Sequence, residues 1–154
     1  ELLNQEFAGR LFCLQNNFAV YEDYALVGTK GYTFEGPFYL DLQGNVIGWD
    51  AEREQHAEKL VARETERLRT SFEMARQAGY RKFIMFLHYP PTNILEETSP
   101  FTEMAREYGV SAVVYSHCHG ESRFGDSIRG VCDGIRYMLV SGDYLGFRPE
   151  LVIG

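Results

Sequence analysis

Two apolar runs in the second half of the chain, each leading into a histidine, constrain the fold most strongly. Phe83–His88 reads FIMFLH, and Ala112–Tyr115 reads AVVY and is followed at once by Ser116 and His117. Unbroken apolar runs of four to six residues are typical of β-strands that are covered on both faces. We therefore expect two strands near the centre of a buried sheet.

The segment between these runs carries the signals of a helix. Ser99 is a typical N-cap residue, Pro100 suits the first helical position, and the helix is expected to end at Tyr108. A strand, a helix and a strand in succession favour parallel pairing of the two strands. The sequence therefore predicts an α/β fold in this half of the chain.

A longer helix is predicted over residues 52–78, where apolar residues recur at mostly three- or four-residue steps among many charges. Asp50 is a plausible N-cap for this helix, and Gly79 suits the position just after its end. His56 lies in the first charged turn, so we expect it to be a solvated surface residue.

The first part of the chain reads as mainly β-structure. Short strands are predicted at Phe12–Asn16, Phe18–Tyr21 and Tyr24–Gly28. The following stretch, Thr29–Asp50, is rich in glycine and aromatic residues, which indicates an ordered excursion. It is either a loop packed by its own rings or a flap beside a substrate.

The C-terminal part contains a hairpin signal. Asp133-Gly134 separates Val131–Cys132 from Ile135–Ser141, and an Asp-Gly pair between apolar segments is typical of a two-residue β-turn. Leu151–Ile153 is predicted to add an edge strand.

Composition limits the classes of function. The 154 residues, 45% of them hydrophobic, predict one domain over residues 1–154, and the net charge of −7 argues against binding to nucleic acid or an anionic membrane. No apolar stretch is long enough to span a bilayer. Cys13, Cys118 and Cys132 form no C-x-x-C pair, which favours a reducing compartment, and the cytoplasm is the expected location.

Three histidines, His88, His117 and His119, follow the two apolar runs and predict a metal site. Loops after parallel strands meet at one edge of a sheet, and neutral imidazole is a common ligand for transition metals. If the segment is extended, His117 and His119 face one ion and Cys118 faces away. If it turns, the two histidines face separate ions. Cys118 is either a fourth ligand or a small buried residue.

Four segments resemble the calcineurin-like metallophosphoesterases, in particular a bacterial branch of predicted phosphohydrolases. They are Phe12–Asn17 (FCLQNN), His88–Pro91 (HYPP), Tyr115–Gly120 (YSHCHG) and Val140–Phe147 (VSGDYLGF). The resemblance covers nearly the whole chain. It implies an α/β fold built as a four-layer αββα sandwich with mixed β-sheets.

The resemblance also implies a chemistry. Members hydrolyse phosphomonoesters or phosphodiesters with two divalent metal ions, which are Mn, Fe or Zn. It implies that His88 and His117 bind one ion, that His119 binds the other, and that Tyr89 lines the substrate side. The expected substrate is a small phosphoester.

The chain departs from the family pattern in its first half. The motifs D-x-H, G-D-x-x-D and G-N-H-[DE] are absent, and Ser116 stands where the family usually has glycine. Nearby carboxylates, Glu121, Asp126 and Asp143, have no spacing that shows them to substitute. We therefore expect the C-terminal part of such a domain, with the N-terminal portion of the fold absent, partial or no metal occupancy, and weak or no catalysis by this chain alone.

The expected missing portion would leave apolar strand edges and one sheet face without cover. We therefore expect self-association, as a homo-oligomer, or association with a missing N-terminal half. One alternative is a non-catalytic metal-binding or interaction module that retains half of the fold. Another is a mononuclear metal hydrolase that uses His88, His117 and His119 with an open fourth position.

Overall fold

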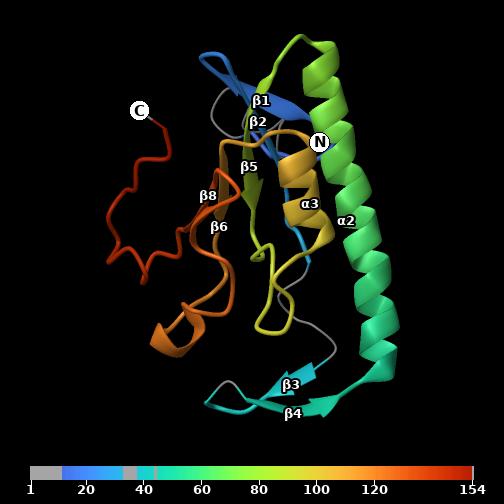
Figure 1. Cartoon of the computed structure of the whole chain (residues 1–154), viewed down its shortest axis with the longest axis vertical. Helices are drawn as coiled ribbons and strands as arrows, with labels where there is room; N and C mark the ends of the chain where they lie inside the picture. Colours follow the sequence, from blue (N-terminus) through green and yellow to red (C-terminus); the bar gives the residue numbers. More distant parts are fainter. Residues whose placement is uncertain (1–11, 33–37, 44, 154) are drawn as a thin grey trace.

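The computed structural model describes residues 12–32, 38–43 and 45–153, and these residues form a mixed α/β structure (Figure 1). A six-stranded mixed sheet has the order β1-β2-β5-β6-β8-β7. Its strands are β1 (Phe18–Tyr21), β2 (Tyr24–Thr29), β5 (Lys82–Leu87), β6 (Ala112–Tyr115), β7 (Gly130–Cys132) and β8 (Ile135–Leu139). The other elements are a two-stranded sheet of β3 (Phe38–Leu40) and β4 (Val46–Trp49), the helices α2 (Ala51–Gln77) and α3 (Pro100–Glu107), and the 3-10 turn η1 (Glu121–Arg123).

The four inner strands, β2, β5, β6 and β8, run parallel, while β1 and β7 pair antiparallel at the two edges. The predicted parallel pairing of β5 with β6 is confirmed, with Met85 opposite Val113. The predicted Asp133-Gly134 hairpin is also confirmed, because both residues have positive φ, 52° and 77°, and join β7 to β8. As a result, the carboxyl ends of the inner strands lie along one edge of the sheet.

Both predicted helices are present. Ser99 caps α3, since its side chain accepts hydrogen bonds from the backbone N–H groups of Phe101 and Thr102, at 3.2 and 3.4 Å. Helix α2 ends before Gly79, whose φ of +97° is readily adopted by glycine. His56 is exposed, as predicted. Within the described ranges, no helix is both long and apolar enough to cross a bilayer.

Helices α2 and α3 cover one face of the sheet (Figure 1). The centre of this interface is aromatic: the ring of Phe72 stacks on Tyr108 at 4.2 Å between centroids and meets Phe83 edge-on at 5.2 Å. All three side chains are buried. Aromatic pairs in such geometries stabilise a core by about 0.5–1.5 kcal/mol beyond the area that they bury.

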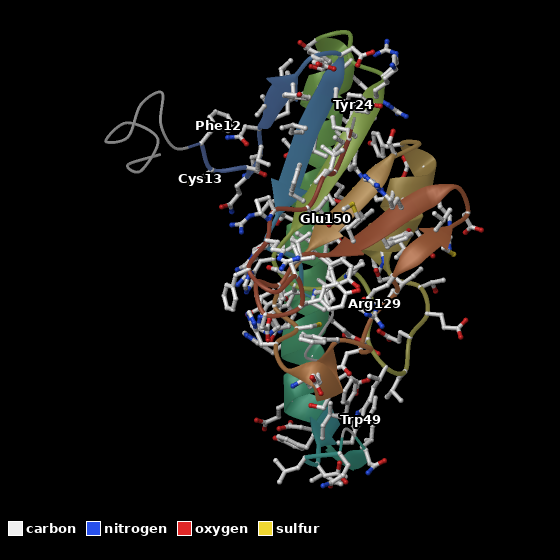
Figure 2. The ribbon with its side chains drawn as sticks, turned by 90° about the vertical axis from the view of Figure 1, so that its left-hand side faces the viewer. Phe12, Cys13, Tyr24, Trp49, Arg129 and Glu150 are labelled. Atoms are coloured by element: carbon white, nitrogen blue, oxygen red, sulfur yellow. The ribbon has the colours of Figure 1, made fainter. Side chains whose placement is uncertain are left out.

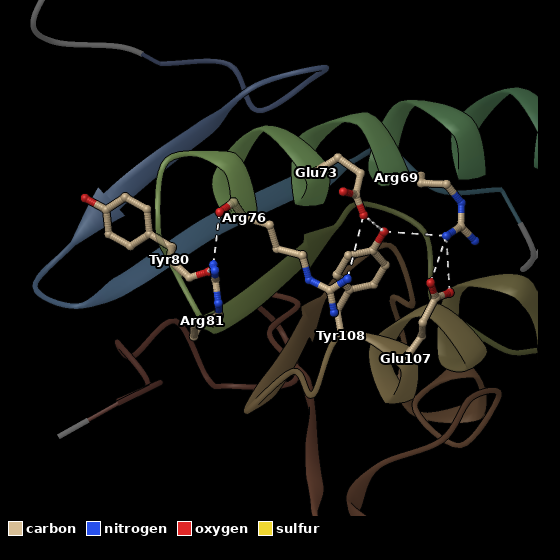
Figure 3. Close-up of polar contacts among 7 residues, drawn as sticks. All are labelled: Arg69, Glu73, Arg76, Tyr80, Arg81, Glu107 and Tyr108. Atoms are coloured by element: carbon tan, nitrogen blue, oxygen red, sulfur yellow. Dashed lines mark hydrogen bonds and ion pairs between the residues drawn. The ribbon is translucent and has the colours of Figure 1, made fainter.

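Polar contacts join the two helices at the rim of this core (Figure 3). The Tyr108 hydroxyl donates a hydrogen bond to Glu73, and burial of the ring is the main reason why the pKa of Tyr108 is raised. Arg69 donates to the Glu107 carboxylate at 3.0 Å, and the Arg76 guanidinium lies 4.1 Å from the centre of the Tyr108 ring. These contacts fix α3 against α2.

The opposite face of the sheet has a different cover. Ile84, Val114 and Met138 form its buried centre, and the half-buried Val152 and Ile153 pack against them. The prediction of an edge strand at Leu151–Ile153 is wrong. The segment lies over the sheet face instead, because apolar contact there removes two side chains from water, whereas edge pairing would not.

The prediction of a strand at Phe12–Asn16 is also wrong, since residues 12–14 are irregular and residues 15–17 bend. The Asn17 side chain explains the bend: its oxygen accepts from the Gln15 N–H at 2.8 Å and its nitrogen donates to the Cys13 carbonyl at 2.9 Å. Such local side-chain bonds compete with strand pairing. The expected excursion at 29–50 contains the β3–β4 hairpin, while residues 33–37 and 44 lie outside the described residues.

Candidate metal-binding site

The predicted site residues lie at the carboxyl edge of the inner strands, where the loops after β5, β6 and β8 gather (Figure 1). His88 follows the last residue of β5, and His117 comes two residues after the end of β6. The parallel pairing of β5 with β6 places both histidines at the same edge. Ligand sites in parallel α/β sheets commonly form at this edge.

The rings of His88 and His117 are in contact. Nδ1 of His117 lies 3.1 Å from Nε2 of His88. Two imidazole nitrogens bound to one metal at the usual Zn–N length of 2.0–2.1 Å are about 3.0–3.4 Å apart, depending on the coordination geometry. The two nitrogens lie at the distance of an ordinary hydrogen bond between the rings, and the same separation is compatible with two ligands of a single ion.

Ser116 and Tyr89 hold this pair in place. The Ser116 backbone N–H and hydroxyl both donate to the His88 carbonyl, at 3.2 and 3.3 Å. The Tyr89 ring lies 4.3 Å from the His117 ring and 4.8 Å from the His88 ring, measured between centroids. Tyr89 therefore lies against the histidine pair.

The segment after β6 turns sharply at His117. The φ of His117 is +69°, and the Cys118 N–H donates to the Ser116 carbonyl at 2.9 Å. Of the two expected conformations, the chain thus has the turn. Cys118 is 1% exposed, which confirms its interpretation as a small buried residue, and burial raises the pKa of its thiol to about 11.

His119 lies beside a carboxylate. Its Nδ1 is 2.9 Å from Asp143 Oδ1, while Asp143 Oδ2 accepts the Gly120 N–H at 2.8 Å. The pKa of Asp143 is held below its usual range mainly by the hydrogen bond from the Gly120 N–H. The hydrogen bond with His119 lowers this pKa further. A carboxylate bonded to a histidine is a common arrangement at metal sites, where it orients the imidazole or joins the ligand set.

The sequence left Asp143 as an unassigned carboxylate. The signal that could have assigned it is its place after the strand β8, which pairs parallel with β6 and so ends at the same edge. Of the other two candidates, Asp126 forms an ion pair with Arg123, and Glu121 lies exposed in η1. Of these three carboxylates, Asp143 is therefore the one that contacts a predicted metal ligand, His119.

The predicted ligands occur as two pairs, His88 with His117 and His119 with Asp143. Among the described residues, no group of three or more His, Cys, Asp or Glu side chains is arranged to hold a metal ion. Each pair could supply two donors, and tetrahedral or octahedral coordination needs more. The described residues therefore supply at most two potential donors at each of the two pairs.

Lys30, directly after β2, is a further charged neighbour that was not among the predicted site residues. Its backbone carbonyl accepts the N–H groups of His88 and Tyr89, at 3.2 and 2.8 Å. Its ammonium lies 6.0 Å from the centre of the Tyr89 ring and 5.9 Å from that of Tyr32. A cation in this position could attract an anionic group that lies beside Tyr89.

Comparison of the chain with known proteins gives no match to a family model, a curated protein or a solved structure.

Proposed function

We propose that the chain forms part of a metal-dependent phosphoester hydrolase of the two-metal type, related to the calcineurin-like metallophosphoesterases. The observation that supports this most is the 3.1 Å separation of the His88 and His117 ring nitrogens at the carboxyl edge of the sheet. A divalent ion bound there would supply Lewis acidity toward the phosphoryl oxygens and would lower the pKa of a bound water.

In this proposal each residue at the edge has a distinct role. His88 and His117 hold one ion, and His119, oriented by Asp143, binds the second. Tyr89 lines the substrate side against the His117 ring. Divalent ions at such sites require carboxylate oxygens, including one that bridges the two ions. Since the two pairs supply one carboxylate, we expect the isolated chain to be catalytically weak or inactive.

The proposed fold is the four-layer αββα sandwich, in which this sheet and its two helices form two adjacent layers. Its support is the apolar face around Ile84, Val114 and Met138. Among the described hydrophobic residues outside the strands, Val140, Val152 and Ile153 pack against this face. A sheet with one such face is stabilised by a second layer. We propose that a missing N-terminal half, or a second copy of the chain, supplies that layer.

The experiment is a cobalt titration of the purified chain, followed by visible absorption and isothermal calorimetry. We expect weak binding of at most one ion, lost in His88→Ala and in His117→Ala. His56→Ala is the matched control, because His56 is exposed on α2, and it should bind like the wild type. Binding that survives both ligand substitutions, or no binding at millimolar cobalt, would contradict the proposed site.

Hydrolysis of p-nitrophenyl phosphate and of its bis ester, with added manganese, then tests catalysis by the chain alone. We expect no turnover above the metal-only background. Two bound ions with turnover would show that the absent motifs are not essential. One tightly bound ion with turnover that His117→Ala abolishes would favour a mononuclear hydrolase.

A second candidate function is a non-catalytic metal-binding or interaction module. The described residues supply two pairs of potential ligands and no group of three, which suits the interaction module better than a catalytic metal centre. The two candidates differ in the parent protein: a D-x-H and a G-N-H-[DE] motif upstream of these residues favour the enzyme. Sequencing the full coding region therefore distinguishes them.

A further inference from the structure

A cavity of about 420 Å³ lies away from the histidine pairs, among the β3–β4 hairpin, the first turns of α2 and the segment 93–100. Figure 2 shows Trp49 at one end of the molecule, beside the end of α2 where that helix begins. The volume falls within the range of about 300–1,000 Å³ that is typical of small-molecule sites. The side chains that line it define what kind of molecule would fit.

Aromatic rings form one part of the lining. Tyr32, Phe38 and Trp49 all border the cavity. Antiparallel pairing of β3 with β4 sets Phe38 opposite Trp49, with their ring centroids 6.1 Å apart and their planes at 41°. The faces of aromatic rings carry partial negative charge and attract cations within about 6 Å.

Carboxylates form another part of the lining. Glu54 and Glu58 project from α2, and Glu96 comes from the segment before α3. The Trp49 indole N–H donates to Glu54 at 3.2 Å, and this bond fixes the carboxylate beside the ring. The Glu58 side chain makes no hydrogen bond or ion pair within the described part of the chain, so its carboxylate is available to a ligand.

The same lining disfavours an anion. None of the described residues around the cavity is lysine or arginine. The start of α3 also borders the cavity, but the Ser99 side chain already accepts the N–H groups of Phe101 and Thr102. An anion would therefore meet three carboxylates and find few donors, whereas a cation would meet rings and carboxylates together.

We propose that this cavity binds a small organic cation with a quaternary or alkylated ammonium group. The aromatic faces of Phe38 and Trp49 contact its methyl groups, and the Glu58 carboxylate balances its charge. This binding is independent of phosphoester hydrolysis and of metal at the histidine pairs.

The test is a titration of the full 154-residue chain with choline, followed by the fluorescence of Trp49, which is the only tryptophan. The control ligand is 3,3-dimethylbutan-1-ol, which has the shape of choline and no charge. We expect choline to bind about five- to twentyfold more tightly than the alcohol, and less tightly as salt is added. Equal affinities for the two ligands, or no binding of choline at millimolar concentration, would overturn the proposal.

Variants test the roles of the ring and the carboxylate, with calorimetry as a readout that does not depend on Trp49. Phe38→Leu keeps an apolar side chain and should weaken choline binding about three- to tenfold. Glu58→Gln should weaken it about two- to fivefold, whereas Glu66→Gln, at an exposed position further along α2, should leave it unchanged. A Glu58→Gln chain that unfolds like the wild type and binds choline equally well would contradict the proposed charge balance.

Discussion

The two faces of the sheet differ in how they are covered. On one face, two helices bury an aromatic centre of Phe72, Phe83 and Tyr108, and side-chain contacts join the helices at its rim. On the other face, Val152 and Ile153 lie over a smaller apolar centre, and the segment that contains these two residues has no regular secondary structure. The first face is closed by two helices, whereas the second is covered, among the described residues, by a short irregular segment. Most of the stability of this chain should therefore reside on the helix side.

The largest expected effect is at the aromatic centre. Phe72→Ala removes a fully buried ring from the helix-covered face and should lower the free energy of unfolding by about 3–5 kcal/mol. Urea denaturation followed by circular dichroism measures the change. Met74→Ala on the same helix, where the side chain is 42% exposed, should change it by less than about 0.5 kcal/mol. If both variants lowered the free energy of unfolding by similar amounts, the helices would not bury this face of the sheet as described.

Cysteine labelling probes the same face without substitution. Cys118 belongs to the buried cluster, and its pKa of about 11 leaves little thiolate at pH 8, whereas Cys13 is exposed. We expect iodoacetamide to modify Cys118 about 100-fold more slowly than Cys13 in the native chain. The rate at Cys118 should rise as pH increases toward 11, because the thiolate is the reactive form.

Peptide mass spectrometry gives both labelling rates in one sample. In urea the two cysteines should react at similar rates, which is the internal control. If Cys118 and Cys13 were labelled equally fast in the native chain, Cys118 would not be buried on the helix-covered face.

The less covered face should respond more weakly. Replacing Val152 and Ile153 together by serine uncovers part of the face around Ile84 and should lower the free energy of unfolding by about 2 kcal/mol. Binding of the dye ANS should increase, and so should self-association measured by light scattering. Leu151→Ser, at a side chain that is 71% exposed, is the control. If the double variant behaves like that control, the segment does not cover the face.

The smallest expected effect has the opposite sign. The Ser141 hydroxyl is buried and has no hydrogen-bond partner among the described residues. Ser141→Ala removes this unsatisfied group and should leave stability unchanged or raise it by up to about 1 kcal/mol. Ser127→Ala should instead lower stability by about 1 kcal/mol, because the Ser127 hydroxyl lies 2.8 Å from that of Thr92. Thermal unfolding compares the two, and a clear loss in Ser141→Ala would imply a partner for its hydroxyl.

The sequence predicted the elements whose pattern is local and unbroken. Phe83–His88 and Ala112–Tyr115 could be recognised as central strands because strands covered on both faces are apolar at every position. The Asp133-Gly134 turn could be recognised because few residue pairs adopt positive φ at both positions. These signals need no knowledge of distant contacts.

Other features depend on contacts that the local pattern does not contain. The apolar pattern at Phe12–Asn16 favours a strand, but the side chain of Asn17 bends the chain. Likewise, Leu151–Ile153 contacts residues far away in the sequence and takes its conformation from them. The candidate metal ligands were predicted by residue type and strand position. Their division into two pairs depends on the turn at His117 and on Asp143, which the chain brings in from beyond β8.

At the His117 turn, the conformation of the backbone and the contact between His117 and His88 favour different residues. A side chain at φ of +69° costs on the order of 1 kcal/mol that glycine would not. The backbone alone would therefore be most stable with no side chain at this position, while the contact with His88 requires an imidazole. Any substitution that relaxes this turn also removes half of the histidine pair, so backbone stability and the contact between the two imidazoles cannot both be optimised in this loop.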